Sequence, residues 1–240
     1  MKKLRTLGIV STVILVFVLA VFALLAALKI FKIETNENGK TEIIFTPLEN
    51  KNPDYIWQTS ETEGDITAVI KTEAGKFEIK LGDCAAAEKF IELDNSGAFE
   101  NAEFSVLAKD MFIQASAEGE GFLAEETGFA CINGAVGFVM EDENAYPSFV
   151  IITAEELSGN SYAFIKNSGF DEEKTKLYES FGGIPEYEGK ILVFGMVTSG
   201  FKTVEKIASG ENSGYTGGFS AVSPVKINSV EISFPTEENR

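Results

Sequence analysis

Short segments with alternating apolar and polar residues, separated by glycine-rich turns, recur between residues 66 and 232, and they constrain the fold most. Residues 66–71 and 76–81 flank Glu73-Ala74-Gly75, which predicts a β-hairpin. The further strands that we expect cover residues 103–108, 111–115, 134–140, 148–154, 192–197 and 225–232. Many short strands joined by such turns are typical of a closed barrel or a sandwich.

Two helices are expected among these strands. Asp83 is a suitable N-cap for a helix that runs through residue 93. A second helix is expected over residues 202–209, with Val204 and Ile207 facing the core. The sequence therefore predicts a mainly β domain with a few helices.

The N-terminus carries Lys2, Lys3 and Arg5, followed by an uncharged apolar stretch over residues 6–28. About 20 apolar residues span a bilayer as a helix, whereas secretory signals have shorter apolar cores. We therefore expect an uncleaved signal-anchor that crosses the membrane through residues 6–30, and a cleaved signal peptide is the alternative. The basic leading end favours a cytoplasmic N-terminus and an extracytoplasmic domain, in a single-pass protein of the cell membrane.

These features divide the chain into four expected parts. Residues 1–31 are the short cytoplasmic end with the anchor, 32–64 a stalk, 65–235 the domain and 236–240 a tail. Thr41–Phe45 is expected to form a short strand within the stalk. Trp57 has two possible places, near the lipid headgroups or against the domain.

Composition excludes several functions. The net charge is −17, which argues against nucleic acid as a partner, and the chain contains no histidine, which excludes Ser/His/Asp and Cys/His catalysis. No phosphate-binding loop, EF-hand loop or metal-ligand spacing is present, so we expect no cofactor and no metal. Cys84 and Cys131 are either buried free thiols or one disulfide.

An ordered series of motifs resembles the cyclophilins, a family of β-barrel prolyl isomerases. The motifs are Gly-Ala-Phe-Glu-Asn-Ala-Glu-Phe at residues 97–104, Phe-Ile-Gln at 112–114, Gly-Ala-Val-Gly-Phe at 134–138, Ser-Phe-Val-Ile at 148–151 and Gly-Gly-Ile-Pro-Glu-Tyr-Glu-Gly-Lys-Ile-Leu-Val-Phe-Gly-Met-Val at 182–197. The resemblance implies a closed antiparallel β-barrel with two or three helices, here preceded by one transmembrane helix. Secreted bacterial members also carry an acidic helical insertion, as residues 171–180 do here.

The resemblance places Val106, Glu186 and Ile191 where the family has its catalytic arginine, tryptophan and histidine. Isomerisation of a peptide bond faces a barrier of roughly 18–20 kcal/mol, and Val106 and Ile191 have no donor that would stabilise the twisted amide. Gln114 matches the family glutamine. The expected peptide-binding groove consists of Met111, Phe112, Gln114, Val139, Met140, Ser148, Val150 and Tyr187.

Two functions follow from this resemblance. The first is a prolyl isomerase that acts on exported proteins, with activity weak or absent because its catalytic positions are replaced. The alternative is a non-catalytic module that binds proline-containing peptides, or exported or membrane proteins, while tethered to the membrane. A third possibility is a structural domain that works through its stalk or its acidic insertion.

Overall fold

A computed structural model describes residues 31–35, 41–45, 55–60 and 65–235. The chain forms two compact units, residues 1–52 and 53–240. In the first unit, β1 (Phe31–Thr35) pairs antiparallel with β2 (Thr41–Phe45), which is the short strand that we expected. The expected membrane anchor lies outside the described residues, and no helix among the described residues is long and apolar enough to cross a bilayer.

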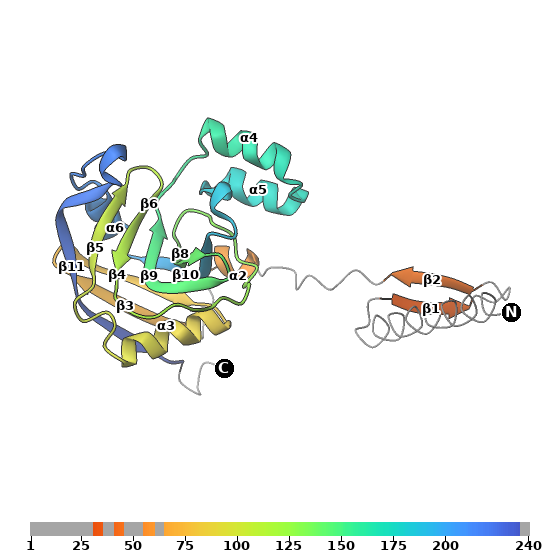
Figure 1. Ribbon diagram of the computed structural model, residues 1–240, viewed down its shortest axis with the longest axis horizontal. Helices are drawn as coiled ribbons and strands as arrows, with labels where there is room; N and C mark the ends of the chain where they lie inside the picture. The colour runs from red at the N-terminus through yellow and green to blue at the C-terminus, as the bar shows by residue number, and fades with distance from the viewer. Residues whose placement is uncertain (1–30, 36–40, 46–54, 61–64, 236–240) are drawn as a thin grey trace, which may run out of the picture. The chain divides into compact units, whose positions relative to one another are not determined.

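The second unit is built on a closed antiparallel barrel of eight strands (Figure 1). The strands are β3 (Ile66–Thr72), β4 (Gly75–Leu81), β5 (Glu103–Ala108), β6 (Phe112–Ser116), β8 (Ala135–Glu141), β9 (Asn144–Ile152), β10 (Ile191–Ser199) and β11 (Ser220–Ser233). Their order around the barrel is β6-β5-β11-β3-β4-β10-β8-β9, and the pairing of β9 with β6 closes it. The short β7 (Phe122–Leu123) also pairs with β9. The expectation of a closed barrel is confirmed.

The largest side chains in the barrel interior are phenylalanines. Phe90 of α3 (Ala85–Asn95) is fully buried, and its ring centroid lies 5.0 Å from those of Phe99 and Phe194. The expectation that Asp83 caps this helix is wrong. The N-cap is Cys84, which has an extended backbone and makes no side-chain capping bond, so the helix begins one residue later than we expected.

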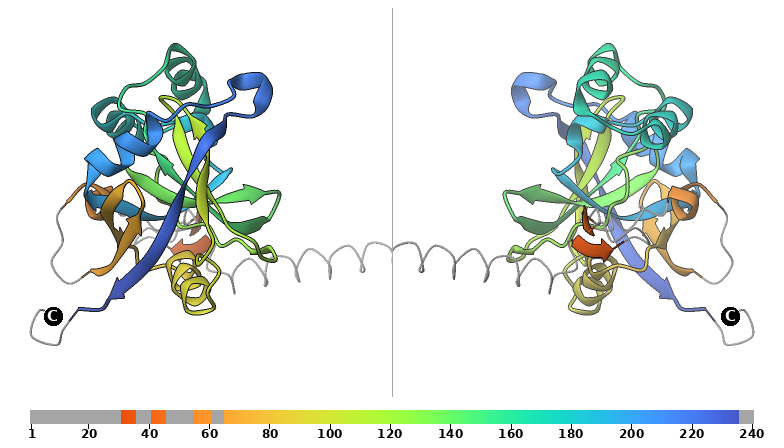
Figure 2. Two further views of the ribbon diagram at one scale, coloured as in Figure 1. Left: turned by 90° about the vertical axis from the view of Figure 1, so that its left-hand side faces the viewer. Right: turned by 90° about the vertical axis from the view of Figure 1, so that its right-hand side faces the viewer.

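The second expected helix is confirmed as α6 (Phe201–Ala208), with Val204 and Ile207 buried in the barrel interior. Between β9 and β10 the chain forms two helices, α4 (Gly159–Ser168) and α5 (Glu172–Phe181). They lie beside each other at one end of the unit in Figures 1 and 2. α5 matches the expected acidic helix, whereas α4 was not expected. We call residues 158–181 the helical insertion.

A short helix, α2 (Tyr55–Thr59), packs against the barrel, and we call residues 55–60 the linker latch. The side-chain amide of Gln58 donates to the carbonyl of Ala130 at 3.0 Å and accepts from its N–H at 2.8 Å. The buried Lys80 donates to the carbonyls of Trp57 and Ser60. The folded unit thus includes residues that we expected in the stalk.

Trp57 lies against the domain, since its ring centroid is 4.9 Å from that of Phe129 and the Lys80 ammonium is 4.6 Å from the indole centroid. Both cysteines are free thiols, Cys84 partly exposed and Cys131 buried. The free-thiol alternative therefore describes this structure.

Candidate functional site

The barrel wall buries apolar side chains on both of its faces. Along β9, Phe149 and Ile151 belong to the interior cluster, while Val150 and Ile152 belong to a second cluster. Because successive side chains of a strand point to opposite faces, this second cluster covers the outside of the barrel wall. We call it the outer cluster. It also includes Tyr55 of the latch and residues of α5.

Strand pairing brings three of the expected site positions into one row on this outer face. Val106 of β5 lies opposite Gln114 of β6, and Gln114 lies opposite Val150 of β9. Val150 in turn lies opposite Gly137 of β8. Directly opposed residues of antiparallel strands share a face, so these side chains are neighbours although they come from separate motifs.

Ile191, which the sequence resemblance placed at the family's histidine position, lies beside this row. A Cβ atom added to Gly137 would lie 2.5 Å from Cγ2 of Ile191, so the isoleucine side chain lies over the glycine backbone. Ile191 is 7% exposed and pairs with Val139, which packs against the outer cluster. An apolar, buried side chain therefore occupies this position.

The expected pocket floor is covered. Val150 is 1% exposed, and Met111, Phe112 and Tyr187 pack against the same outer cluster. The rings of Phe112 and Tyr187 meet edge to face with their centroids 5.7 Å apart. The face is thus apolar and closed over Val150, where a proline ring would need an open hollow.

The remaining expected groove residues differ in their surroundings. Gln114 is half-buried, and its amide has no hydrogen-bond partner within the part of the chain that the structure describes. The Ser148 hydroxyl lies 3.3 Å from both the N–H and the carbonyl of Ala117. Met140 packs against the interior cluster, so it does not share a face with Val139, because neighbouring residues of a strand point in opposite directions.

Glu186, which the sequence resemblance placed at the family's tryptophan position, binds the helical insertion. It lies in the short 3-10 helix η1 (Pro185–Tyr187), and its two carboxylate oxygens accept from the Ser161 hydroxyl at 3.0 and 3.2 Å. Ser161 is buried in the first turn of α4. Sequence reasoning did not identify Ser161, since nothing local marks a serine as the partner of a carboxylate 25 residues away.

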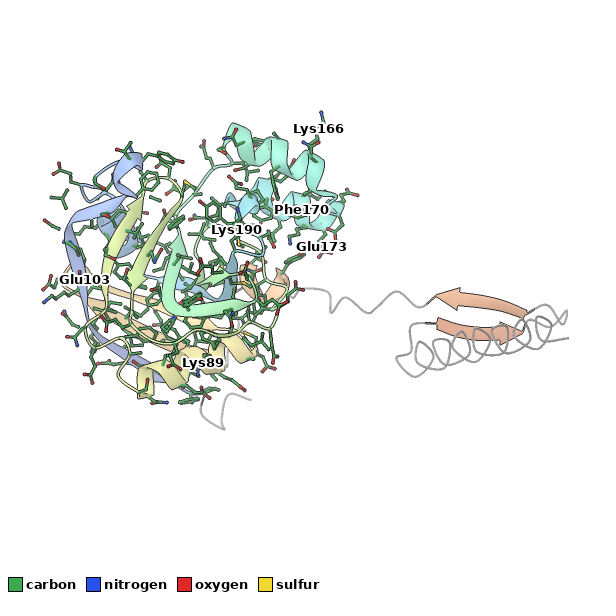
Figure 3. The ribbon with its side chains drawn as sticks, viewed as in Figure 1. Lys89, Glu103, Lys166, Phe170, Glu173 and Lys190 are labelled. Carbon is green, nitrogen blue, oxygen red and sulfur yellow. The ribbon has the colours of Figure 1, made fainter. Side chains whose placement is uncertain are left out.

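A second set of hydrogen-bonded side chains attaches α5 to the barrel. The Tyr178 hydroxyl donates to Glu188 and accepts from the Cys131 N–H at 2.9 Å, and Lys174 pairs with Glu188 at 2.9 Å. Figure 3 marks Phe170 and Glu173 in the same insertion. Burial raises the pKa of Tyr178 and of the Cys131 thiol, so both stay protonated at neutral pH. These groups therefore act in packing and hydrogen bonding, and Cys131 does not supply a thiolate nucleophile.

Taken together, the outer face offers apolar contacts and one amide. Neither Val106 nor Ile191 carries a side-chain donor, and the Glu186 carboxylate accepts hydrogen bonds from Ser161. The half-buried Met111, Phe112 and Tyr187 leave apolar surface that an extended segment can contact. The face has few groups that would stabilise the charge distribution of a twisted amide.

Comparison with known proteins finds similarity to one family both in sequence and in structure. Residues 67–232 match the family model described as "Cyclophilin type peptidyl-prolyl cis-trans isomerase/CLD". A peptidyl-prolyl cis-trans isomerase, cypE of Dictyostelium discoideum, is 30% identical over 145 residues, which cover 59% of this chain and 83% of the relative. A crystal structure of a cyclophilin type peptidyl-prolyl cis-trans isomerase from Cryptosporidium parvum has a TM-score of 0.51 at 17% identity and covers 70% of this chain and 98% of that protein. The same protein was also solved in the presence of the dipeptide ala-pro, with the same similarity.

Proposed function

Because this chain belongs to the cyclophilin-type peptidyl-prolyl cis-trans isomerase family, we propose that its outer face binds extended proline-containing segments of exported or membrane proteins and that its isomerase activity is weak or absent. Binding is supported by the half-buried apolar side chains of the outer face, Val106, Phe112 and Tyr187, which accompany Gln114 there. The Cryptosporidium parvum protein was solved in the presence of the dipeptide ala-pro, which supports the same ligand class.

The proposal that isomerase activity is weak or absent rests on one observation, the row of Val106, Gln114 and Val150 with Ile191 beside it. Loss of a single preorganised donor from a catalytic site typically lowers the rate by about 10²–10³-fold. Here two positions that the family uses for donors hold aliphatic side chains. The barrier of roughly 18–20 kcal/mol is then lowered little.

Closure of the face over Val150 favours the alternative, a binding module without catalysis. Such a module needs only apolar contacts and the Gln114 amide, and it does not require the prolyl ring to enter a hollow. Its clients would be held in an extended form rather than isomerised.

Exchange NMR on proline-containing peptides with residues 53–240 separates the two functions. We expect chemical-shift changes at the Val106 and Val150 methyl groups with cis/trans exchange at the uncatalysed rate. Exchange well above that rate, lost in Gln114→Ala and kept in Ser209→Ala at the exposed end of α6, would establish catalysis and refute the weak-activity proposal. No shift on the outer face with any peptide would refute the binding function.

We also propose that residues 6–30 anchor the chain in the cell membrane with the barrel on the extracytoplasmic side. The uncharged stretch and the basic residues before it support this placement. Protease added to intact cells should digest a C-terminal tag on the full chain. Digestion only after the membrane is permeabilised would contradict this orientation.

A further inference from the structure

A surface pocket begins where the outer face ends, and nothing in the proposed function uses it. Its volume is about 710 Å³, and it lies between the loop after β7, the end of β8, the turn before β10 and α5. Ile191 belongs both to the outer face and to the lining of this pocket. We call it the flanking pocket.

The floor and one edge of the flanking pocket are apolar. Phe129, Met140, Ile191 and Leu192 line it. Leu123 stands at the same pocket and is 69% exposed, although leucine is an apolar residue. These side chains offer contact to a chain of methylene groups.

The rim of the flanking pocket is acidic. Glu126, Asp142 and Glu143 line it, and in the part of the chain that the structure describes none of these carboxylates has an ion-pair partner. The one lysine in the lining, Lys174, is already paired with Glu188 at 2.9 Å. A nearby cation, Lys190, marked in Figure 3, has its ammonium 5.2 Å from the Tyr187 ring centroid.

An apolar floor beneath unpaired carboxylates matches one kind of side chain. Lysine and arginine lay their methylene stems along apolar surfaces and keep the charged end in water. We propose that the flanking pocket binds a lysine or arginine side chain next to the proline of the bound segment, and so selects basic proline-containing clients. This inference rests on the proposed function, since the same segment would lie on the outer face.

The test uses the full chain in detergent micelles with methyl groups labelled for NMR. Short extended peptides carry one proline and a neighbouring lysine, and matched peptides carry norleucine, which has a similar stem without the charge. We expect the lysine peptide to bind about tenfold more tightly than the norleucine peptide at low salt. Each exposed ion pair raises the affinity only a few-fold, but three carboxylates act together on the lysine. It should also shift the methyl signals of Met140 and Ile191.

A matched pair of variants separates this pocket from the overall charge of the protein. E126Q/D142N/E143Q should remove the preference for lysine. E103Q/E118Q/E120Q removes the same number of negative charges from exposed or half-buried positions that do not line the flanking pocket, and it should keep the preference. Equal binding of the two peptides, or equal loss in both variants, would overturn the inference.

Failure of the proposed function would look different. Shifts at Val106 and Val150 with equal affinity for both peptides would leave outer-face binding intact and overturn only the flanking pocket. If no peptide shifts the outer face, N-acetyl-lysine methylamide at millimolar concentration should still shift Met140 and Ile191 more than its norleucine counterpart. Absence of that difference would overturn the pocket on its own.

Discussion

Replacing Gln58 with alanine should destabilise the barrel unit substantially. Gln58 is 4% exposed, and its amide satisfies both the N–H and the carbonyl of Ala130, which is fully buried. Gln58→Ala removes both partners at once and leaves two backbone groups unsatisfied. Each unsatisfied buried group costs about 1–3 kcal/mol, so the expected loss for the two groups is about 2–6 kcal/mol, with the lower end applying where water enters the space. Typical domains have only about 5–15 kcal/mol of stability.

Urea unfolding of residues 53–240 measures this loss with a local probe. Trp57 is the only tryptophan in the sequence and lies in the latch against Phe129, so its fluorescence reports the latch while far-UV circular dichroism reports the barrel. Thr59→Ala is the matched control, because Thr59 lies on the same helix, its side chain is exposed, and its hydroxyl donates to the Tyr55 carbonyl one turn earlier. Thr59→Ala should lower the free energy of unfolding by less than about 0.5 kcal/mol. A Gln58→Ala loss below about 1 kcal/mol, or one equal to the control, would refute the reasoning.

Three further predictions concern the outer face and its surroundings. Gly137→Ala should lower the free energy of unfolding by about 1–3 kcal/mol, since the new Cβ would meet Ile191 at 2.5 Å and the Leu192 carbonyl at 2.8 Å; an unchanged urea midpoint would contradict this. Both thiols should react with Ellman's reagent in denaturant without reductant, and recovery of fewer than two would indicate a disulfide. Burial raises the pKa of Tyr178, so its protonation stabilises the folded state fully below about pH 10, and this stability is lost as the pH rises further. In Tyr178→Phe the free energy of unfolding should therefore fall less steeply at alkaline pH than in the unmodified protein. Parallel plots of unfolding free energy against pH for the two proteins would show that Tyr178 does not contribute.

The strands were predictable because their signal is local. Alternation places β5 at the expected residues and β4 within one residue of them. α4 lacks such a signal, since Tyr162 and Phe164 are exposed and only Ser161 is buried in it. The latch was missed for another reason. A short helix of this kind is stabilised by distant partners such as Ala130, and sequence spacing does not reveal them.

In the candidate site, too, features with a local sequence signal were predictable, whereas contacts between distant residues were not. The row of Val106, Gln114 and Val150 depends on strand order, which the ordered family motifs supplied. The place of Met140 was predictable from alternation, because it follows Val139 directly in a strand. The bond between Ser161 and Glu186 was not, since it joins the helical insertion to a turn that is remote in sequence. The roles of these site residues stay predictions until the exchange experiment is done.

The linker latch also limits how far the barrel can reach. Residues 55–60 are packed on the barrel, so the ten positions 55–64 add no length to the stalk, whereas in extended chain each would add about 3.3 Å. For a chain tethered through residues 6–30, as we propose, a stalk counted to residue 64 therefore overestimates the maximal reach by roughly 30 Å. The volume that a tethered domain searches grows steeply with that length. In such a tethered chain the linker latch would keep the barrel at a higher effective concentration near the bilayer, and so favour clients that emerge close to the membrane surface.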